Sequence, residues 1–409
     1  MAVTIGHAKA VINPQLPVPL SGYDASRICT GIHDPLYARV LVFHDQEYHA
    51  LIALDTLAVD QQFTSLVQTA LVDLGFAKEH IILSATHTHS GPQGLCTCQG
   101  SVLEGLERTF GVYDPAYASF CVQQIAEAVK TAQQNQKSYQ IKFVQTAVFG
   151  VAQERHGRSS AMDGLLWALE FILEDDLPLL LYSYPCHPTI LNAQNKELSA
   201  DLCYGVETSL AQRYQMTVFV NGAAGDISTR FARKEATFAE VLRMGELVAD
   251  TITASLATAA VQDAGTLHWQ EYCYELQLKK LPALEQAEKL VSYYEQKLLE
   301  QSSRLLESQL EGARANLHLT KHLGHQSNPV CKIIKANLGP LRLVTMPLEL
   351  YGSLAAKVAD QTLILGYANG YYLYLPDHLA YEEQDYEALS SPFAQGQGEQ
   401  LMDWIQTIL

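Results

Sequence analysis

Three apolar segments of this chain have the composition of buried β-strands, and each leads directly into a loop that carries histidine, aspartate or serine. They are residues 81–83 followed by SATHTHSGP, residues 179–184 followed by PCHP, and residues 216–220 followed by NGAAGDIS. In open α/β sheets, binding and catalytic sites gather at the carboxyl ends of the strands. The recurrence therefore predicts a sheet with a functional site at one edge, and it is more informative than any single loop.

Strand-like and helical patterns alternate along the first half of the chain. Residues 37–43 (YARVLVF) and 49–54 (HALIAL) are β-rich runs, whereas residues 60–74 have apolar side chains at helical spacing. Further strand-like runs are residues 140–148 and 165–173, and further helical patterns are residues 116–131 and 202–214. We therefore expect an α/β fold in which helices flank a mixed β-sheet core.

The C-terminal half contains a helical segment. Residues 281–322 are rich in Glu, Gln, Lys, Leu and Ala at helical spacing, which predicts a helical hairpin packed on the body of the protein. Strand character returns at residues 332–336 and 341–345. Since the sequence has no internal repeat and no low-complexity linker, we expect residues 1–409 to form a single domain.

Composition excludes several classes of protein. The net charge of −17 argues against a nucleic-acid partner, because binding to phosphates needs a surplus of Lys and Arg. No segment approaches about 18 consecutive apolar residues, so we expect no transmembrane helix. The N-terminus has no basic region followed by an apolar run, so we expect no export and expect the eight scattered cysteines to be free thiols. We therefore expect a cytoplasmic protein.

The strongest candidates for chemistry are His87 and His89. On a strand, residues two positions apart point to the same side, so one imidazole could bind a metal while the other transfers protons. The alternative is that both are ordinary polar loop residues. His187, between Cys186 and Pro188, has a similar choice between a metal ligand and a hydrogen-bonded structural residue.

The other candidates are individually weaker. Asp226 and Ser228 follow a glycine-containing turn, where backbone N–H groups could bind an oxyanion or form a simple turn. Glu349 lies two residues after a proline at a strand end. Four tyrosines near a glycine-bearing stretch are interpreted as packing, because aromatic clusters usually are; they are Tyr367, Tyr371, Tyr372 and Tyr374.

Taken together, these motifs resemble one family, the neutral (non-lysosomal) ceramidases. The matching blocks keep the family's order over nearly the whole chain, and THTHSGP is the most specific of them. They are GIHDPLYAR (31–39), SATHTHSGP (84–92), GDIS (225–228), PLE (347–349), GYANGY (366–371) and EEQDYEA (382–388).

The resemblance implies two sets of site residues. A catalytic zinc would be bound by His87, His187, Glu349 and Tyr374. His89, Arg155, Asp226 and Ser228 would lie near the reacting centre. The chain departs from the family pattern at three positions: Glu154 replaces an asparagine, Leu348 replaces a glycine, and Thr229 replaces a proline. It also resembles a short form, without the C-terminal immunoglobulin-like domain, whereas known members are secreted or membrane-facing.

The implied chemistry is hydrolysis of an amide bond by zinc-activated water. His89 would protonate the leaving amine, Arg155 or a tyrosine would orient the substrate, and Ser228 would act as nucleophile or support the site. The predicted function is a zinc-dependent N-acyl amidohydrolase of small or lipid-like substrates, in sphingolipid metabolism if ceramide is the substrate. The alternatives are a zinc esterase or deacylase of a small soluble metabolite, and a non-catalytic metal-binding protein.

Overall fold

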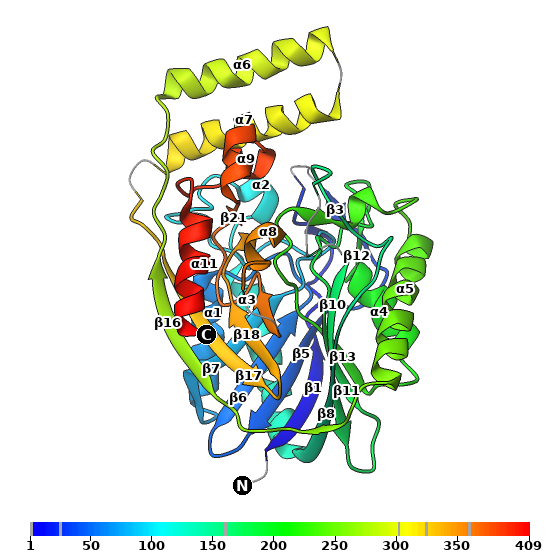
Figure 1. Cartoon of the computed structure of the whole chain (residues 1–409). Coiled ribbons are helices and arrows are strands. Elements are labelled where there is room, and N and C mark those ends of the chain that lie inside the picture. Colours follow the sequence, from blue (N-terminus) through cyan, green and yellow to red (C-terminus); the bar gives the residue numbers. More distant parts are fainter. Residues whose placement is uncertain are drawn as a thin grey trace.

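A large mixed β-sheet forms the centre of the computed structural model (Figure 1), which describes residues 3–23, 27–158, 162, 164–301, 303–323, 326–358 and 361–409. In spatial order its strands are β13 (Met216–Phe219), β11 (Leu179–Ser183), β10 (Leu165–Leu173), β8 (Lys137–Ala147), β1 (Thr4–Val11), β5 (Tyr37–His44), β6 (Tyr48–Leu54) and β7 (Phe76–Ala85); β15 (Gln262–Asp263) pairs with β8. β6 pairs in parallel with β7, and β11 in parallel with β13. The three polar loops follow β7, β11 and β13, and the last two lie at the same edge because β11 and β13 run in parallel.

Smaller sheets complete the strand framework. A second sheet has the order β16 (Trp269–Glu275), β17 (Val330–Leu338), β18 (Leu341–Thr345) and β20 (Thr362–Leu365). Short pairs join β19 (Glu349–Leu350) to β21 (Tyr374–Leu375), β9 (Gln153–Glu154) to β14 (Ile227–Ser228), β4 (Gly31–Ile32) to β12 (Glu197–Leu198), and β2 (Val18–Pro19) to β3 (Ile28–Cys29). The β19–β21 and β9–β14 pairs lie in the segments that carry predicted site residues.

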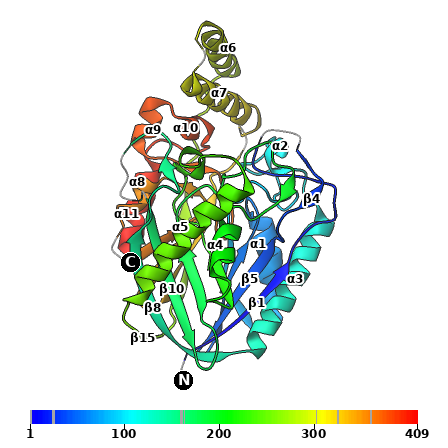
Figure 2. The same cartoon turned by 90° about the vertical axis from the view of Figure 1, so that its right-hand side faces the viewer.

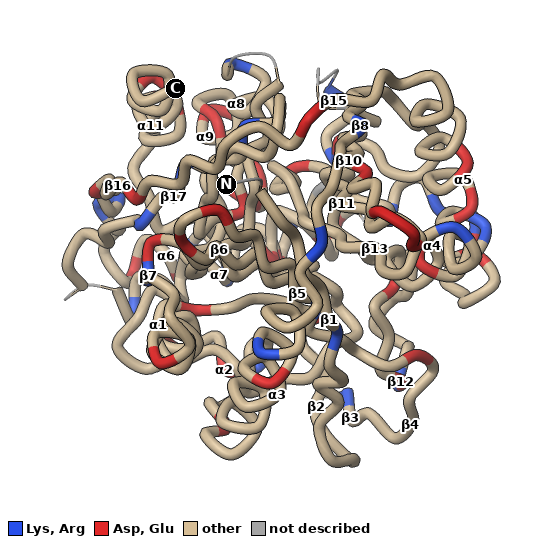
Figure 3. Tube along the Cα trace, turned by 90° about the horizontal axis from the view of Figure 1, so that it is seen from below, with Lys and Arg blue, Asp and Glu red and all other residues tan. Residues whose placement is uncertain are grey.

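Helices cover the central sheet (Figure 2). They are α1 (Gln61–Val72), α2 (Glu107–Phe110), α3 (Pro115–Gln134), α4 (Leu202–Leu210), α5 (Phe238–Ala257), α8 (Gly352–Ala355), α9 (His378–Glu383), α10 (Tyr386–Ser390) and α11 (Gln397–Ile408), with a 3-10 turn at Thr229–Phe231. α3 packs on β1 and β5, whereas α5 packs on β8 and β10. Charged residues lie mostly on the outer helices and loops (Figure 3), and the inner strands β5 and β6 are almost wholly buried.

The predicted helical hairpin is confirmed. α6 (Leu284–Glu300) and α7 (Arg304–His322) stand at one end of the molecule, at the top of Figure 1. α7 lies against α10, and the two hairpin helices meet along a small apolar seam of Tyr294, Leu310 and Ala313. The hairpin is therefore attached to the body mainly through α7.

The α/β fold class predicted from the sequence is confirmed, and so are the strands expected before the three polar loops. The helix predicted over residues 202–214 ends earlier, at Leu210, because the chain must turn into β13 beside β11. The sequence patterns do not predict β1 or the twenty-residue helix α5. None of the helices in the described ranges is long and apolar enough to cross a membrane.

α4 and α5 approach closely at two glycines, which gives a stability prediction. A Cβ atom on Gly245 would lie 2.2 Å from the backbone of Gly205, so the helices must separate to admit it. We expect Gly245→Ala to lower the free energy of unfolding by about 2 kcal/mol, despite the helix propensity gained. Urea denaturation measures this, with Glu246→Ala on an exposed position of α5 as the control, expected within about 0.5 kcal/mol of wild type. Wild-type stability of Gly245→Ala would mean that the helix contact is not tight.

Candidate metal centre

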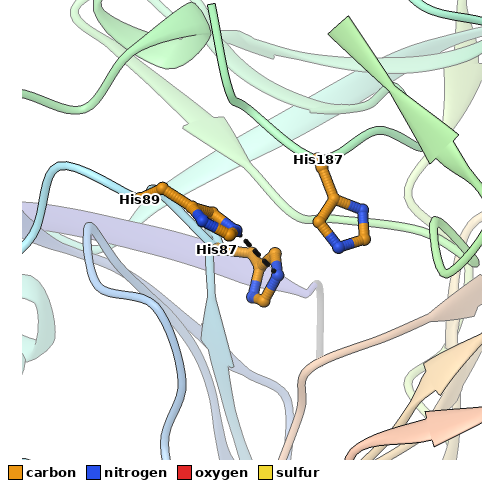
Figure 4. A group of neighbouring side chains, drawn as sticks. All are labelled: His87, His89 and His187. Carbon is orange, nitrogen blue, oxygen red and sulfur yellow. Dashed lines mark hydrogen bonds between the residues drawn. The ribbon is translucent and has the colours of Figure 1, made fainter. Parts of the chain in front are cut away.

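Three histidines converge where the loops after β7 and β11 meet. His87 and His89 follow β7, and His187 follows β11. Figure 4 shows the three imidazole rings around a common space, and their ligand nitrogens all lie within 4.8 Å of one another. His87 and His187 are buried, while His89 is partly exposed. Residues about one hundred positions apart in the sequence are thus brought into one cluster by loops that follow two different strands of the large sheet.

The backbone fixes which nitrogen of each buried imidazole is free. The Nδ1 of His87 lies 2.7 Å from the Leu57 carbonyl oxygen, and the Nδ1 of His187 lies 2.8 Å from that of Ala224. A carbonyl oxygen only accepts hydrogen bonds, so both Nδ1 atoms carry the proton and both Nε2 atoms present a lone pair. His87 also adopts a left-handed backbone, with φ of 66°, a strained conformation that is typical of functional sites.

A carboxylate completes the cluster. The Oε2 atom of Glu349 lies 2.8 Å from His187 Nε2 and 3.5 Å from His87 Nε2. The hydroxyls of Tyr371 and Tyr367 donate to the same carboxylate, the second at 3.4 Å. All of these groups are buried, so the lone pairs and the charge of the carboxylate face one another away from water.

Two further side chains border this space. The Tyr374 hydroxyl lies 3.4 Å from His187 Nε2, and β21 places Tyr374 opposite Glu349 of β19 in a parallel pair. On the other side, His89 Nε2 lies 3.4 Å from His87 Nε2. The structure therefore brings together His87, His187, Glu349 and Tyr374, the four residues that the sequence resemblance implies as metal ligands, with His89 beside them.

The electrostatics of the cluster suit a cation. Burial lowers the pKa of His87 to about 3 and moves the pKa values of His89 and His187 well below their usual range. Burial, with Glu349 nearby, raises the pKa of the Tyr374 hydroxyl. Neutral imidazoles are the form that binds metal, and two imidazoles with a carboxylate are ligands typical of zinc and other transition metals. The donor set therefore fits a divalent metal ion.

Arg155, Asp226 and Ser228 lie around the cluster. The Arg155 guanidinium lies 5.9 Å from the centre of the Tyr374 ring and pairs with Glu387 at 2.5 Å. Ser228 Oγ lies 2.9 Å from Thr189 Oγ1, and Asp226 Oδ1 accepts the Gly352 N–H at 2.7 Å. The catalytic roles of these three residues stay predictions. The described contacts connect Asp226 to the segment of Gly352 and Ser228 to the segment of Thr189.

Asp226 gives a pH prediction. Burial raises the pKa of its carboxyl to about 7, above the value of about 3.9 in an unfolded chain. Because the folded protein then binds more protons between these values, its free energy of unfolding falls as pH rises from about 4 to 7, by up to about 4 kcal/mol. Asp226→Asn keeps the acceptor for Gly352 but cannot ionise, so we expect a flatter pH profile.

Urea denaturation between pH 4 and 8, at constant zinc concentration, tests this prediction. Asp250→Asn, at an exposed position of α5, is the matched control and should keep the slope of the wild type. An Asp226→Asn variant with the wild-type slope would show that this carboxyl does not ionise in that range.

Sequence reasoning missed several residues that build the site. The sequence predicts a packing role for Tyr367 and Tyr371, yet both donate to Glu349. The Tyr367 ring also stacks on the His87 ring, with 4.2 Å between the ring centres. Glu387 had been noted only within a matching block. The position of the two tyrosines between Glu349 and Tyr374 in the sequence was a signal that they belong to the site. Their hydrogen-bond partner, Glu349, is identified only by the structure, in which β19 pairs with β21.

Comparisons with known proteins agree with this architecture. Residues 4–234 match a family described as neutral/alkaline non-lysosomal ceramidase, N-terminal. The crystal structure of neutral ceramidase from Pseudomonas aeruginosa has a similar fold, with a TM-score of 0.78 and 17% identity, covering 99% of this chain and 74% of that one. A ceramidase complexed with C2 gives a TM-score of 0.76, 16% identity and the same coverage. No curated protein matches the chain.

Proposed function

Because the chain belongs to the neutral/alkaline non-lysosomal ceramidase family, we propose that it is a zinc-dependent hydrolase of N-acyl amides. One observation carries the proposal: the free Nε2 atoms of His87 and His187 meet the Glu349 carboxylate within 3.5 Å, beside Tyr374. These four residues are the proposed zinc ligands. Catalytic zinc sites keep a position for water and can expand to five ligands, so four protein ligands leave room for one water molecule.

Zinc bound there would acidify a water molecule to a pKa of about 7 and polarise the amide carbonyl. His89 is proposed to accept a proton from the attacking water and to pass it to the leaving amine. Its neutral imidazole borders the cluster, and its Nδ1 has no hydrogen-bond partner among the described residues. Arg155, next to Tyr374, is proposed to orient the acyl group.

Ser228 is proposed to support the site rather than attack the substrate. A serine nucleophile needs a base within hydrogen-bond reach. The Ser228 hydroxyl instead pairs with Thr189 and accepts the Arg230 N–H, and its backbone bridges to His187. Asp226 is proposed to act in the same supporting way, through Gly352. Residues 1–409 are proposed to form one catalytic domain, and the cytoplasmic location stays a prediction.

A substrate panel tests the function. Purified protein with about one equivalent of zinc is assayed on ceramides of short and long acyl chain, on N-acyl amino acids, and on esters of the same acyl groups. We expect amide hydrolysis that a chelator abolishes and added zinc restores. Turnover of the esters alone would replace the proposal with a zinc esterase or deacylase. No turnover of any substrate, with zinc stoichiometrically bound, would indicate a non-catalytic metal-binding protein.

A further inference from the structure

Glu387 is a buried carboxylate that the proposed chemistry does not use. Its side chain accepts three hydrogen bonds: from Arg155 at 2.5 Å, from the Tyr351 hydroxyl at 3.0 Å and from His156 at 3.1 Å. Only 1% of the residue is exposed. We propose that Glu387 is a positioning residue, which holds the Arg155 guanidinium against Tyr374 at the metal centre. This inference rests on the proposed function of that centre.

Arg155 is held at both ends. Its backbone N–H donates to the Asp226 carbonyl at 2.8 Å, and its guanidinium is bound by Glu387 beside the Tyr374 ring. An arginine side chain loses much conformational freedom when it is fixed, and a charge-assisted hydrogen bond is strong enough to select one conformation. With Glu387 removed, the guanidinium would keep its charge but lose the bond that aims it at Tyr374.

The Glu387 carboxyl is charged under ordinary conditions. Burial alone would raise its pKa, but Arg155 and His156 together lower it to about 2. Glu387 and Arg155 are therefore both charged near neutral pH. Removing Glu387 would leave the partly buried Arg155 guanidinium without its charged partner, which is costly for a charge held away from water.

Glu387 also connects three separate segments at this point. It lies on α10, it binds the turn after β9 through Arg155 and His156, and it binds Tyr351 two residues beyond Glu349. α10 itself packs against β21, which carries Tyr374. The carboxylate thus fixes Arg155 relative to the same strands that carry two of the proposed metal ligands.

A second contact joins the turn after β9 to the chain between α9 and α10, and this contact provides a control. Arg158 pairs with Asp385 at 2.7 Å and with Glu383, whose side chain is half-exposed. Glu383 has no described contact with Arg155. A change at Glu383 therefore weakens the contact of this part of the chain with Arg158, and it leaves the Arg155 guanidinium in place.

The test is a double-mutant cycle of Glu387→Gln and Arg155→Ala, measured as kcat and KM on the best substrate of the wild type. We expect Glu387→Gln to lower kcat about 10- to 100-fold with little change in KM and with zinc content retained. In the Arg155→Ala background it should change kcat less than about twofold, because its effect passes through Arg155. Glu383→Gln should stay within about twofold of wild type.

Additive losses, with Glu387→Gln as damaging in Arg155→Ala as in wild type, would overturn the inference and leave the proposed function intact. If Glu387→Gln fails to fold, Glu387→Asp tests the same point, since it keeps the charge but is too short to reach Arg155.

A second readout does not depend on turnover. The absorption spectrum of the protein loaded with cobalt(II) in place of zinc should change equally in Glu387→Gln, Arg155→Ala and the double variant, and not in Glu383→Gln. An unchanged spectrum in Glu387→Gln, while Arg155→Ala alters it, would also overturn the inference. An inactive wild type that gives the expected spectra would refute the proposed function alone.

Discussion

Substitution of His187 by alanine is expected to remove both the metal and the activity. Zinc content should fall from about one per chain to less than about 0.1, because zinc binding would depend on the full set of protein ligands. Turnover should fall at least about 1000-fold, which corresponds to about 4 kcal/mol of transition-state stabilisation. The reason is geometric: His187 Nε2 lies nearer to the Glu349 carboxylate than His87 Nε2 does, and the Nδ1 of His187 is hydrogen-bonded to the Ala224 carbonyl.

Elemental analysis of wild type and variant, purified side by side, measures the metal. His378→Ala is the matched control, because His378 is an exposed histidine of α9, and it should keep both zinc and turnover. His87→Ala should behave like His187→Ala. Full activity with bound zinc in either variant would refute the assignment, and a wild type that takes up no zinc would refute the metal centre itself.

The second large effect is expected at Glu349. Glu349→Gln removes the charged ligand, so we expect zinc affinity to fall by more than about 100-fold, since loss of outer-shell partners alone costs 10- to 100-fold. Tyr371→Phe removes a hydrogen bond to this carboxylate but keeps the carboxylate. We therefore expect its zinc affinity to fall by only about 10- to 100-fold. Comparison of the two variants therefore distinguishes a zinc ligand, Glu349, from a residue that orients it, Tyr371.

Competition with a chromophoric zinc chelator measures both affinities. Tyr372→Phe is the control, because its hydroxyl points to the Val330 carbonyl rather than to Glu349, and it should bind zinc as the wild type does. If Tyr371→Phe and Tyr372→Phe bind zinc equally well, the Tyr371 hydroxyl does not contribute. If Glu349→Gln keeps wild-type affinity, Glu349 is not a ligand.

Local patterns were sufficient to predict the strands that carry the site. The runs at residues 81–83, 179–184 and 216–220 are apolar because the strands are covered on both faces, and short polar loops follow them. The parallel pairings of β6 with β7 and of β11 with β13 fix the strand directions only within each pair, and the sequence pattern predicted neither pairing. His87 and His187 could be expected near each other because both follow apolar strands and because the family resemblance implies that they bind one metal.

The supporting contacts could not be predicted in this way. Glu387 binds Arg155 across 232 residues of sequence, and nothing in either local pattern identifies the partner. The protonated nitrogen of each imidazole depends on backbone carbonyls of Leu57 and Ala224, which every residue type possesses. The left-handed backbone of His87 could not be predicted either, because non-glycine residues seldom adopt that conformation, although histidine does so more often than most.

The parallel pairing of β19 with β21 has a consequence for how the sequence can change by insertion and deletion. Glu349 and Tyr374 are register partners, so their separation is set by the ladder between two short strands and not by the length of chain between them. Residues can therefore be gained or lost in the loops of that stretch while the two side chains keep their spacing. One residue added within β21 itself, between Tyr374 and Leu375, would instead place the new residue opposite Glu349 or opposite Leu350 and so break one of the two pairs.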